Sequence, residues 1–63
     1  MPEGFNQQQQ QMNEIKSIID GIEDKEVLRA LMRERQEARK RMRRGERETV
    51  EDLKQMISRI TAD

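Results

Sequence analysis

The chain has 63 residues, 41% of them charged and 32% hydrophobic, with one aromatic residue and neither cysteine nor histidine. This length suits one small domain, and the missing side chains exclude disulfides, thiolate or imidazole zinc sites, and catalysis by cysteine or histidine. Thirteen basic and thirteen acidic side chains give a formal net charge of zero, so the distribution of charge is more informative than its total.

The N-terminal part of the chain predicts a short tail and a first helix. Residues 1–5 hold the only proline and little apolar surface, so we expect a disordered tail. Glutamine favours helix, so residues 7–11 should form the exposed first turns of a helix over residues 6–20, and Asn6 with Gln9 matches a capping box. Apolar residues at intervals of three and four then form a narrow seam of the coiled-coil type: Met12, Ile15, Ile19 and Ile22.

A glycine interrupts this seam before the next helical segment. Gly21 would cost about 1 kcal/mol inside a helix, so we expect a turn there and a second helix over residues 24–44. The next glycine, Gly45, favours a helix stop, so we expect the second helix to end just before it. The apolar stripe of this helix consists of Val27, Leu28, Leu31, Met32, Ala38 and Met42. The alternative is a continuous helix through Gly21, which would form an extended coiled coil.

The C-terminal part predicts a third helix over residues 49–62. Thr49 and Asp52 match a capping box. The apolar face that follows consists of Val50, Leu53, Met56, Ile57 and Ile60. A connection as short as residues 45–48 usually joins antiparallel helices, so the third helix should fold back on the second, with the first packed across both. The sequence thus predicts an all-α fold, a helical hairpin or three-helix unit that forms one small domain over residues 6–63.

The small number of large apolar residues, fifteen in all, predicts self-association. We expect a coiled-coil-like dimer or higher oligomer whose seam consists of Met12, Ile15, Ile19, Ile22, Leu28, Leu31, Arg35, Met42, Leu53, Ile57 and Ile60. Arg35 falls within the apolar stripe, where an unpaired charge is very costly. It either pairs with a carboxylate on a facing helix, Glu14 or Glu51 being the candidates, or packs its stem and extends its head to water.

Charge is segregated along the chain. Residues 1–28 carry a net charge of −4, residues 29–47 carry +6, and residues 48–63 carry −2. The middle segment has eight arginines and one lysine, and arginine binds carboxylates and phosphates with two parallel hydrogen bonds. The candidate cations for binding an anionic partner are Arg29, Arg33, Arg39, Lys40, Arg41, Arg43 and Arg44. Four of them, Arg29, Arg33, Lys40 and Arg44, should form a ridge opposite the apolar stripe of the second helix.

Three functions fit this pattern. The first is a non-enzymatic interaction protein that binds an acidic protein surface or a nucleic acid through its arginines. The second is an adaptor or inhibitor that docks a partner protein through the Met/Ile/Leu seam, with arginines that only keep it soluble. In the third, the basic face is simply solvated, with Glu37 pairing Arg33 and Arg41, and Glu26 pairing Arg29.

Catalysis finds no support in the sequence. Ser17, Ser58, Thr49 and the lysines have no histidine, cysteine or tyrosine to activate them, and three scattered glycines form no phosphate-binding loop. The acidic residues at 20–24 do not follow the spacing of a calcium loop. We therefore expect no enzyme activity, metal, cofactor or small-molecule substrate. No apolar run is long enough to cross a membrane, and the lack of a signal peptide favours the cytoplasm.

Overall fold

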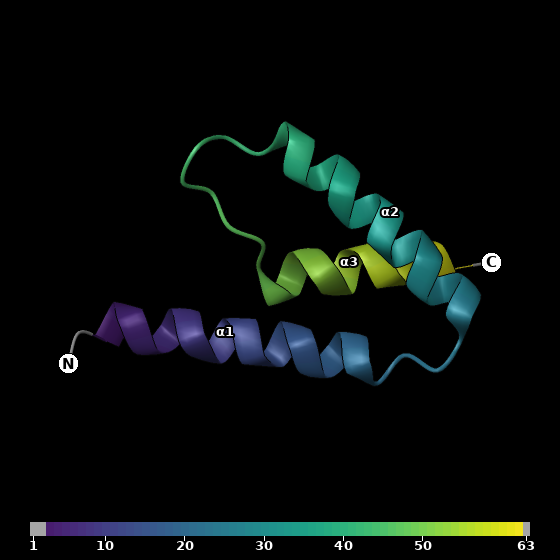
Figure 1. The fold of residues 1–63 in the computed structure, drawn as a ribbon, viewed down its shortest axis with the longest axis horizontal. Helices are drawn as coiled ribbons and strands as arrows, with labels where there is room; N and C mark the ends of the chain where they lie inside the picture. Colours follow the sequence, from purple (N-terminus) through teal and green to yellow (C-terminus); the bar gives the residue numbers. More distant parts are fainter. Residues whose placement is uncertain (1–2, 63) are drawn as a thin grey trace.

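A computed structural model describes the backbone of residues 3–62 and the side chains of residues 7–62. It contains three helices, α1 (Glu3–Asp20), α2 (Lys25–Arg41) and α3 (Val50–Thr61), and no strand within the described residues (Figure 1). The predicted all-α fold with three helices is confirmed. The molecule is elongated, with extents of 42 × 25 × 16 Å.

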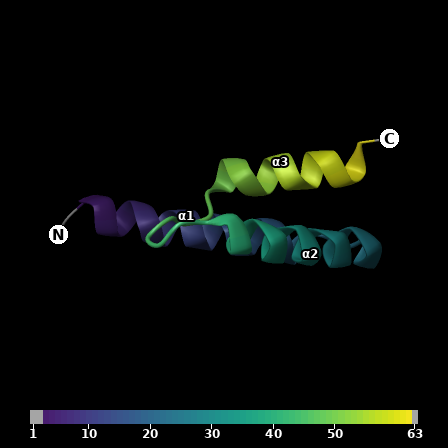
Figure 2. The ribbon, with the colours of Figure 1, turned by 90° about the horizontal axis from the view of Figure 1, so that it is seen from above.

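The helix α3 joins the other two. In Figure 1, α1 and α2 diverge from the turn that connects them, and α3 lies between their directions. Figure 2, turned by 90°, shows α3 to one side of α1 and α2, so it covers one side of the opening between them. The main packing contacts are those of α3 with α2 and of α3 with α1. The first helix therefore packs chiefly on the third, and not across both as the sequence predicts.

The turn between α1 and α2 confirms the predicted bend, and the alternative of one continuous helix is wrong. Beyond Asp20, the Gly21 N–H donates a hydrogen bond of 3.1 Å to the Ser17 carbonyl and closes the last turn of α1. Asp24 is the N-cap of α2, and its Oδ1 accepts a 2.9 Å bond from the Glu26 N–H. Gly21 does not adopt a positive φ, so the turn does not require the conformational freedom of glycine. The N-cap at Asp24, which starts the new helix, defines the turn instead.

The start of α1 differs from the prediction. The helix begins at Glu3, so Asn6 lies within it and is not its N-cap. Residues 3–5 of the predicted tail have helical backbone, while residues 1–2 lie outside the described residues. The glutamine tract explains the difference, because a run of good helix formers lets helical hydrogen bonding extend towards the N-terminus beyond Met12, the first residue of the seam.

The end of α2 also differs, since the helix stops at Arg41, three residues before the predicted Arg44. Met42 is extended, with φ −72° and ψ 142°. The chain then forms a tight turn over Arg43–Glu46, in which Gly45 has a φ of 90°. Glycine is favoured at such a position, so Gly45 serves a reverse turn outside the helix. Because α2 stops early, residues 42–49 are available to reverse the chain. A helix that reached Arg44 would leave a shorter connection.

The start of α3 follows the predicted capping box. The Thr49 hydroxyl accepts a 3.1 Å bond from the Asp52 N–H, and the Asp52 carboxylate accepts a 3.2 Å bond from the Thr49 N–H. A third bond was not predicted, in which the Gln11 Oε1 accepts the Val50 N–H at 3.1 Å. Because the first N–H groups of a helix have no partner within it, this glutamine of α1 completes the cap and ties α1 to α3.

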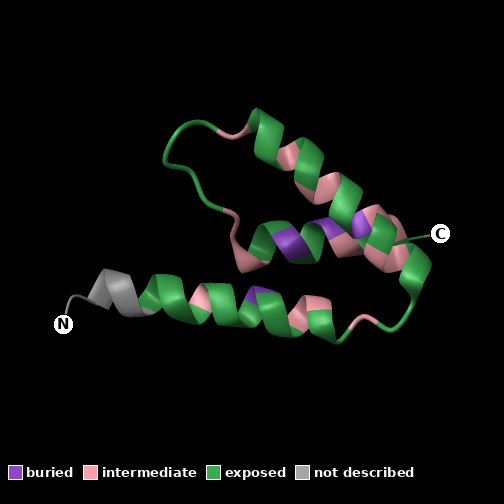
Figure 3. Ribbon diagram, in the orientation of Figure 1, coloured by how far each residue is buried: buried purple, intermediate pink, exposed green. Residues whose placement is uncertain are grey.

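The core lies where the three helices meet. One residue of α1, one of α2 and two of α3 are buried: Ile15, Leu31, Leu53 and Met56. Partly buried apolar residues pack around them: Ile18, Ile19, Ile22, Ala38, Val50, Ile57 and Ile60. Figure 3 shows the buried positions on the facing sides of the helices. No polar or charged side chain is buried among residues 7–62, so burial of apolar surface holds this fold together.

Truncating a core leucine should destabilise the protein strongly. Leu53 is fully buried, and Leu→Ala at such a site costs about 2–5 kcal/mol, which is a large part of the stability of a chain this short. We expect Leu53→Ala to lower the urea midpoint and the Tm measured by circular dichroism, or to abolish the folded state. Met12→Ala is the matched control, because Met12 is 58% exposed. Equal losses in the two variants would contradict the packing described.

Candidate functional site

The predicted oligomer seam is largely used within one chain. Most of its apolar members belong to the core or pack against it: Ile15, Ile19, Ile22, Leu31, Leu53, Ile57 and Ile60. Leu28 and Met42 are half-buried outside that cluster, and Met12 is 58% exposed. Contact between chains stays a prediction, and it has fewer free apolar side chains to use than the sequence suggested.

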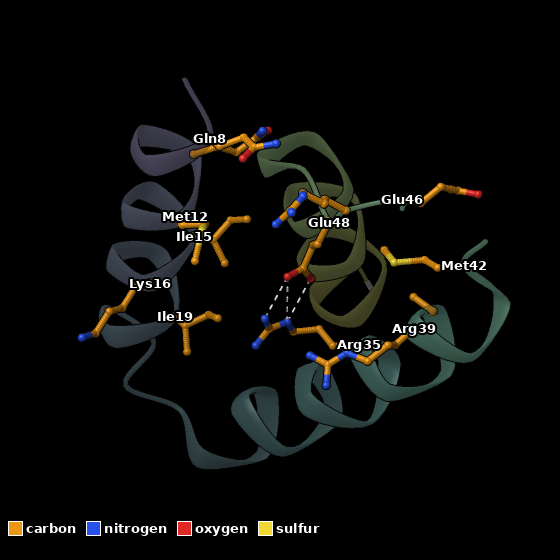
Figure 4. Close-up of a pocket in the computed structure, with 13 residues that line it drawn as sticks. Gln8, Met12, Ile15, Lys16, Ile19, Arg35, Arg39, Met42, Glu46 and Glu48 are labelled. Atoms are coloured by element: carbon orange, nitrogen blue, oxygen red, sulfur yellow. Dashed lines mark hydrogen bonds and ion pairs between the residues drawn. The ribbon is translucent and has the colours of Figure 1, made fainter. Parts of the chain in front are cut away.

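Arg35, the charged member of the seam, pairs with Glu48. Its Nε lies 3.2 and 2.9 Å from the two carboxylate oxygens, and its Nη2 lies 2.8 Å from Oε1 (Figure 4). The side chains are only 22% and 18% exposed, so the pair is shielded better than most surface ion pairs. Of the alternatives for Arg35, pairing with a carboxylate is the one observed, but the prediction of a partner on a facing helix, Glu14 or Glu51, is wrong. Helical spacing could not predict Glu48 as the partner of Arg35, because Glu48 lies in the loop before α3.

A cleft opens between α1 and α2 beside this ion pair. Its volume is about 710 Å³, and Figure 4 shows Met12, Ile15 and Ile19 of α1 pointing towards the Arg35–Glu48 pair. The complete lining consists of Gln8, Gln11, Met12, Ile15, Lys16, Ile19, Arg35, Ala38, Arg39, Met42, Glu46, Arg47 and Glu48. The sequence did not predict this cleft, because it depends on how far α1 and α2 diverge.

The predicted cations form what we call the basic surface: Arg29, Arg33, Arg39, Lys40, Arg41, Arg43 and Arg44. All of them are exposed. Lys40 lies 3.5 Å from Glu37, and both side chains are exposed. The predicted pairs of Glu37 and Glu26 with arginines do not form. None of the six arginines of the basic surface has an ion pair among the described residues.

The predicted ridge is shorter than expected. Because α2 ends at Arg41, Arg43 and Arg44 lie in the following loop. Arg44 therefore does not continue a helical row with Arg29 and Lys40. Arg29, Arg33 and Lys40 share one side of α2, and Arg39 and Arg41 flank that row on opposite sides of it. The basic surface therefore wraps around α2 and continues into an exposed loop at Arg43 and Arg44.

None of the carboxylates of residues 29–47 pairs with a guanidinium group of the basic surface. Glu34 pairs with Arg59 of α3 at 3.0 Å, and Glu37 pairs with Lys40. Glu46 accepts a 3.1 Å bond from the Arg43 backbone N–H. These are the only three acidic residues of residues 29–47. The arginines of the basic surface thus keep their guanidinium groups free of intramolecular carboxylates over the described part of the chain.

Other kinds of site find no basis in the described residues. Over this part of the chain, no three or more acidic side chains lie together in a way that could hold a metal ion, and Asp20, Glu23 and Asp24 form no such group. No helix described has the length and apolar character needed to cross a membrane. Comparison with protein-family models, curated proteins and solved structures found no match.

A double-mutant cycle should detect the ion pair. We expect Arg35→Ala and Glu48→Ala to be non-additive in the free energy of unfolding by at least about 0.5 kcal/mol, because the groups share a partly buried contact. The cycle of Arg35→Ala with Glu51→Ala is the control and should be additive. Additivity in both cycles, measured by urea denaturation, would show that Glu48 is not the working partner.

Proposed function

We propose that this protein is a non-catalytic interaction protein that binds an anionic macromolecule through the basic surface. The observation that carries the proposal is the set of six exposed arginines without an ion pair, beside carboxylates engaged elsewhere. A guanidinium group donates in a fixed fork that matches a carboxylate or a phosphate. The surface therefore suits an acidic protein or the backbone of a nucleic acid.

The helix dipole accounts for only part of this cluster. Arg39, Lys40 and Arg41 occupy the last turn of α2, where a positive charge is favoured by about 0.3–1 kcal/mol. Arg29 lies in the first half of α2 and Arg33 lies at its midpoint, so neither is in the last turn and the dipole gives them no benefit. A role in folding does not explain those two arginines, which supports their use in binding.

The adaptor hypothesis has weaker support in its original form. It requires a free apolar seam, and most of that seam packs inside the chain. An adaptor would have to use the few apolar side chains that stay accessible, among them Met12 and Met32.

Neutral substitutions should separate binding from overall charge. We expect Arg29→Gln with Arg33→Gln to weaken binding of a short DNA duplex or of polyglutamate by about tenfold or more at low salt, since glutamine cannot pair with an anion. With DNA the slope of log affinity against log salt should fall by about one for each phosphate that the variant no longer binds. Fluorescence anisotropy at several salt concentrations measures both quantities.

The matched control is Lys25→Gln with Lys54→Gln. It changes the net charge equally and removes exposed cations that also lack an ion pair among the described residues. Glutamine keeps helix propensity, and circular dichroism checks that the fold is retained. Equal effects of the two double variants would leave the arginines as solubilising charge and overturn the proposal.

Self-association remains part of the proposal. Only four apolar side chains are buried within the described residues, which is a small core even for a chain of this size. Leu28 and Met32 lie one turn apart on α2 and outside the core cluster, so they offer a contact for a second copy. A dimer would also double the basic surface and so strengthen the attraction of an anionic partner.

Sedimentation should therefore find a dimer or higher oligomer at micromolar concentration. The Tm should rise with protein concentration, because association stabilises the folded state by mass action. Met32→Glu should lower the association constant by placing a charge in the contact. A monomer whose Tm stays constant over a hundredfold dilution would contradict self-association.

A further inference from the structure

The cleft between α1 and α2 combines apolar walls with unbalanced positive charge. Met12, Ile15 and Ile19 line it from α1, and Ala38 and Met42 line it from α2 and the residue that follows. Met12 is 58% exposed, although burial of a methionine side chain is favourable by about 1.5–3 kcal/mol. The fold thus leaves apolar surface uncovered in a concave position, where an apolar side chain of another molecule could cover it.

The charges around the cleft select an acidic occupant. Four cations and two carboxylates line it. Glu48 is already neutralised by Arg35, and Glu46 points away from the apolar walls in Figure 4. Arg39 and Arg47 have no ion pair among the described residues. An occupant with carboxylates beside its apolar face would complement both features of the cleft.

The same charges disfavour a second copy of this chain in a symmetric dimer through the cleft. A two-fold axis would place the cleft against itself, so two surfaces that each carry more cations than carboxylates would face one another. Like charges opposed in this way cost free energy. A dimer formed through Leu28 and Met32 avoids this cost.

The lining also disfavours nucleic acid. Proteins that hold bases in a groove use aromatic side chains for stacking, and the lining contains none. A phosphate backbone would leave the methionine and isoleucine side chains without an apolar partner. The cleft therefore suits a protein segment better than it suits DNA or RNA.

The backbone of the cleft walls favours a helical segment. Both long walls are helices, whose backbone groups are paired within the helix, so they present no strand edge to which an extended peptide could add. Recognition must then come from side chains, as when an amphipathic helix lies in a groove with anchors at i, i+3 or i+4, and i+7. With α3 covering one side of the opening (Figure 2), a helix in the cleft would complete a four-helix arrangement.

We propose that this cleft binds an acidic amphipathic helix of a partner protein, whose apolar residues cover Met12, Ile19 and Met42 and whose carboxylates pair with Arg39 and Arg47. This rests on the proposed function, of which it names the partner class. It assigns to the cleft a task separate from that of Arg29 and Arg33, which do not line it.

The test uses the full chain and two synthetic peptides. One has leucines at i, i+3, i+4 and i+7 among glutamates and alanines, and the other has the same composition in scrambled order. We expect the ordered peptide to bind at least about tenfold more tightly by fluorescence anisotropy, and to gain helicity on binding. Equal affinities, or no binding of the ordered peptide at its highest soluble concentration, would overturn the proposal.

Two exposed methionines provide matched variants. Met12→Glu should weaken binding of the ordered peptide by about tenfold or more, because it removes an apolar contact and adds a charge that repels the peptide. Met32→Glu makes the same chemical change outside the cleft and, at a protein concentration too low for self-association, should alter the affinity by less than about twofold. Circular dichroism should show both variants folded, since both side chains are about half exposed. Similar effects of the two variants would contradict binding in the cleft.

Further measurements identify other occupants and separate the two proposals. If Met12→Glu abolishes self-association, the cleft binds a second copy and the proposal is wrong. The proposal is also wrong if a DNA duplex displaces the ordered peptide from the wild-type chain and Met12→Glu removes this competition, because the cleft then binds a nucleic acid. The Arg29→Gln with Arg33→Gln variant should still bind the ordered peptide within about threefold. Failure of the basic surface thus appears with DNA and polyglutamate, and failure of the cleft appears with the peptides.

Discussion

The ion pair between Arg35 and Glu48 sets the geometry on which the other features depend. It holds the loop before α3 against the middle of α2 with three hydrogen bonds, and the early end of α2 at Arg41 leaves the chain enough length to return there. That return places Thr49 to start α3, and it places the carboxylate of Glu48 at the base of the cleft. A partly buried charge pair specifies one arrangement of helices more sharply than apolar contacts can, because each charge is costly without the other.

The core and the binding surfaces compete for the same limited set of apolar residues. The fold uses Ile15, Leu31, Leu53 and Met56 to join three helices, which leaves charged side chains to form most of the outer surface. The binding that we propose therefore relies on arginine, with a small apolar contribution from Met12 and its neighbours. Such a surface gives fast, salt-sensitive association, whereas the apolar walls of the cleft would contribute affinity that depends little on salt.

The starts of α2 and α3 could be predicted from neighbouring residues, but the start of α1 and the end of α2 were predicted wrongly. Contacts between distant residues could not be predicted at all. The cap at Asp24 and the capping box at Thr49 follow from side chains that bind backbone groups two or three residues away. The Gln11 bond to Val50 joins residues 39 positions apart, and no local pattern encodes it. The exposure of Arg29, Arg33 and Lys40 was predictable from their place opposite the apolar stripe. The loop position of Arg43 and Arg44 depends on the early end of α2, and the cleft depends on the angle between α1 and α2.

The early end of α2 also makes the chain accessible to proteolysis. Arg43, Arg44 and Arg47 follow the helix in an exposed segment that contains the Gly45 turn. Proteases bind substrates in extended form, and exposed loops are where cleavage concentrates, so enzymes that cut after basic residues should find their first sites here. A cut would separate the chain into an α1–α2 fragment and an α3 fragment, held together by the core, by the Arg35–Glu48 and Glu34–Arg59 pairs and by the Gln11 bond to Val50. A partner that covers this loop would then protect the protein from degradation and thereby set its lifetime.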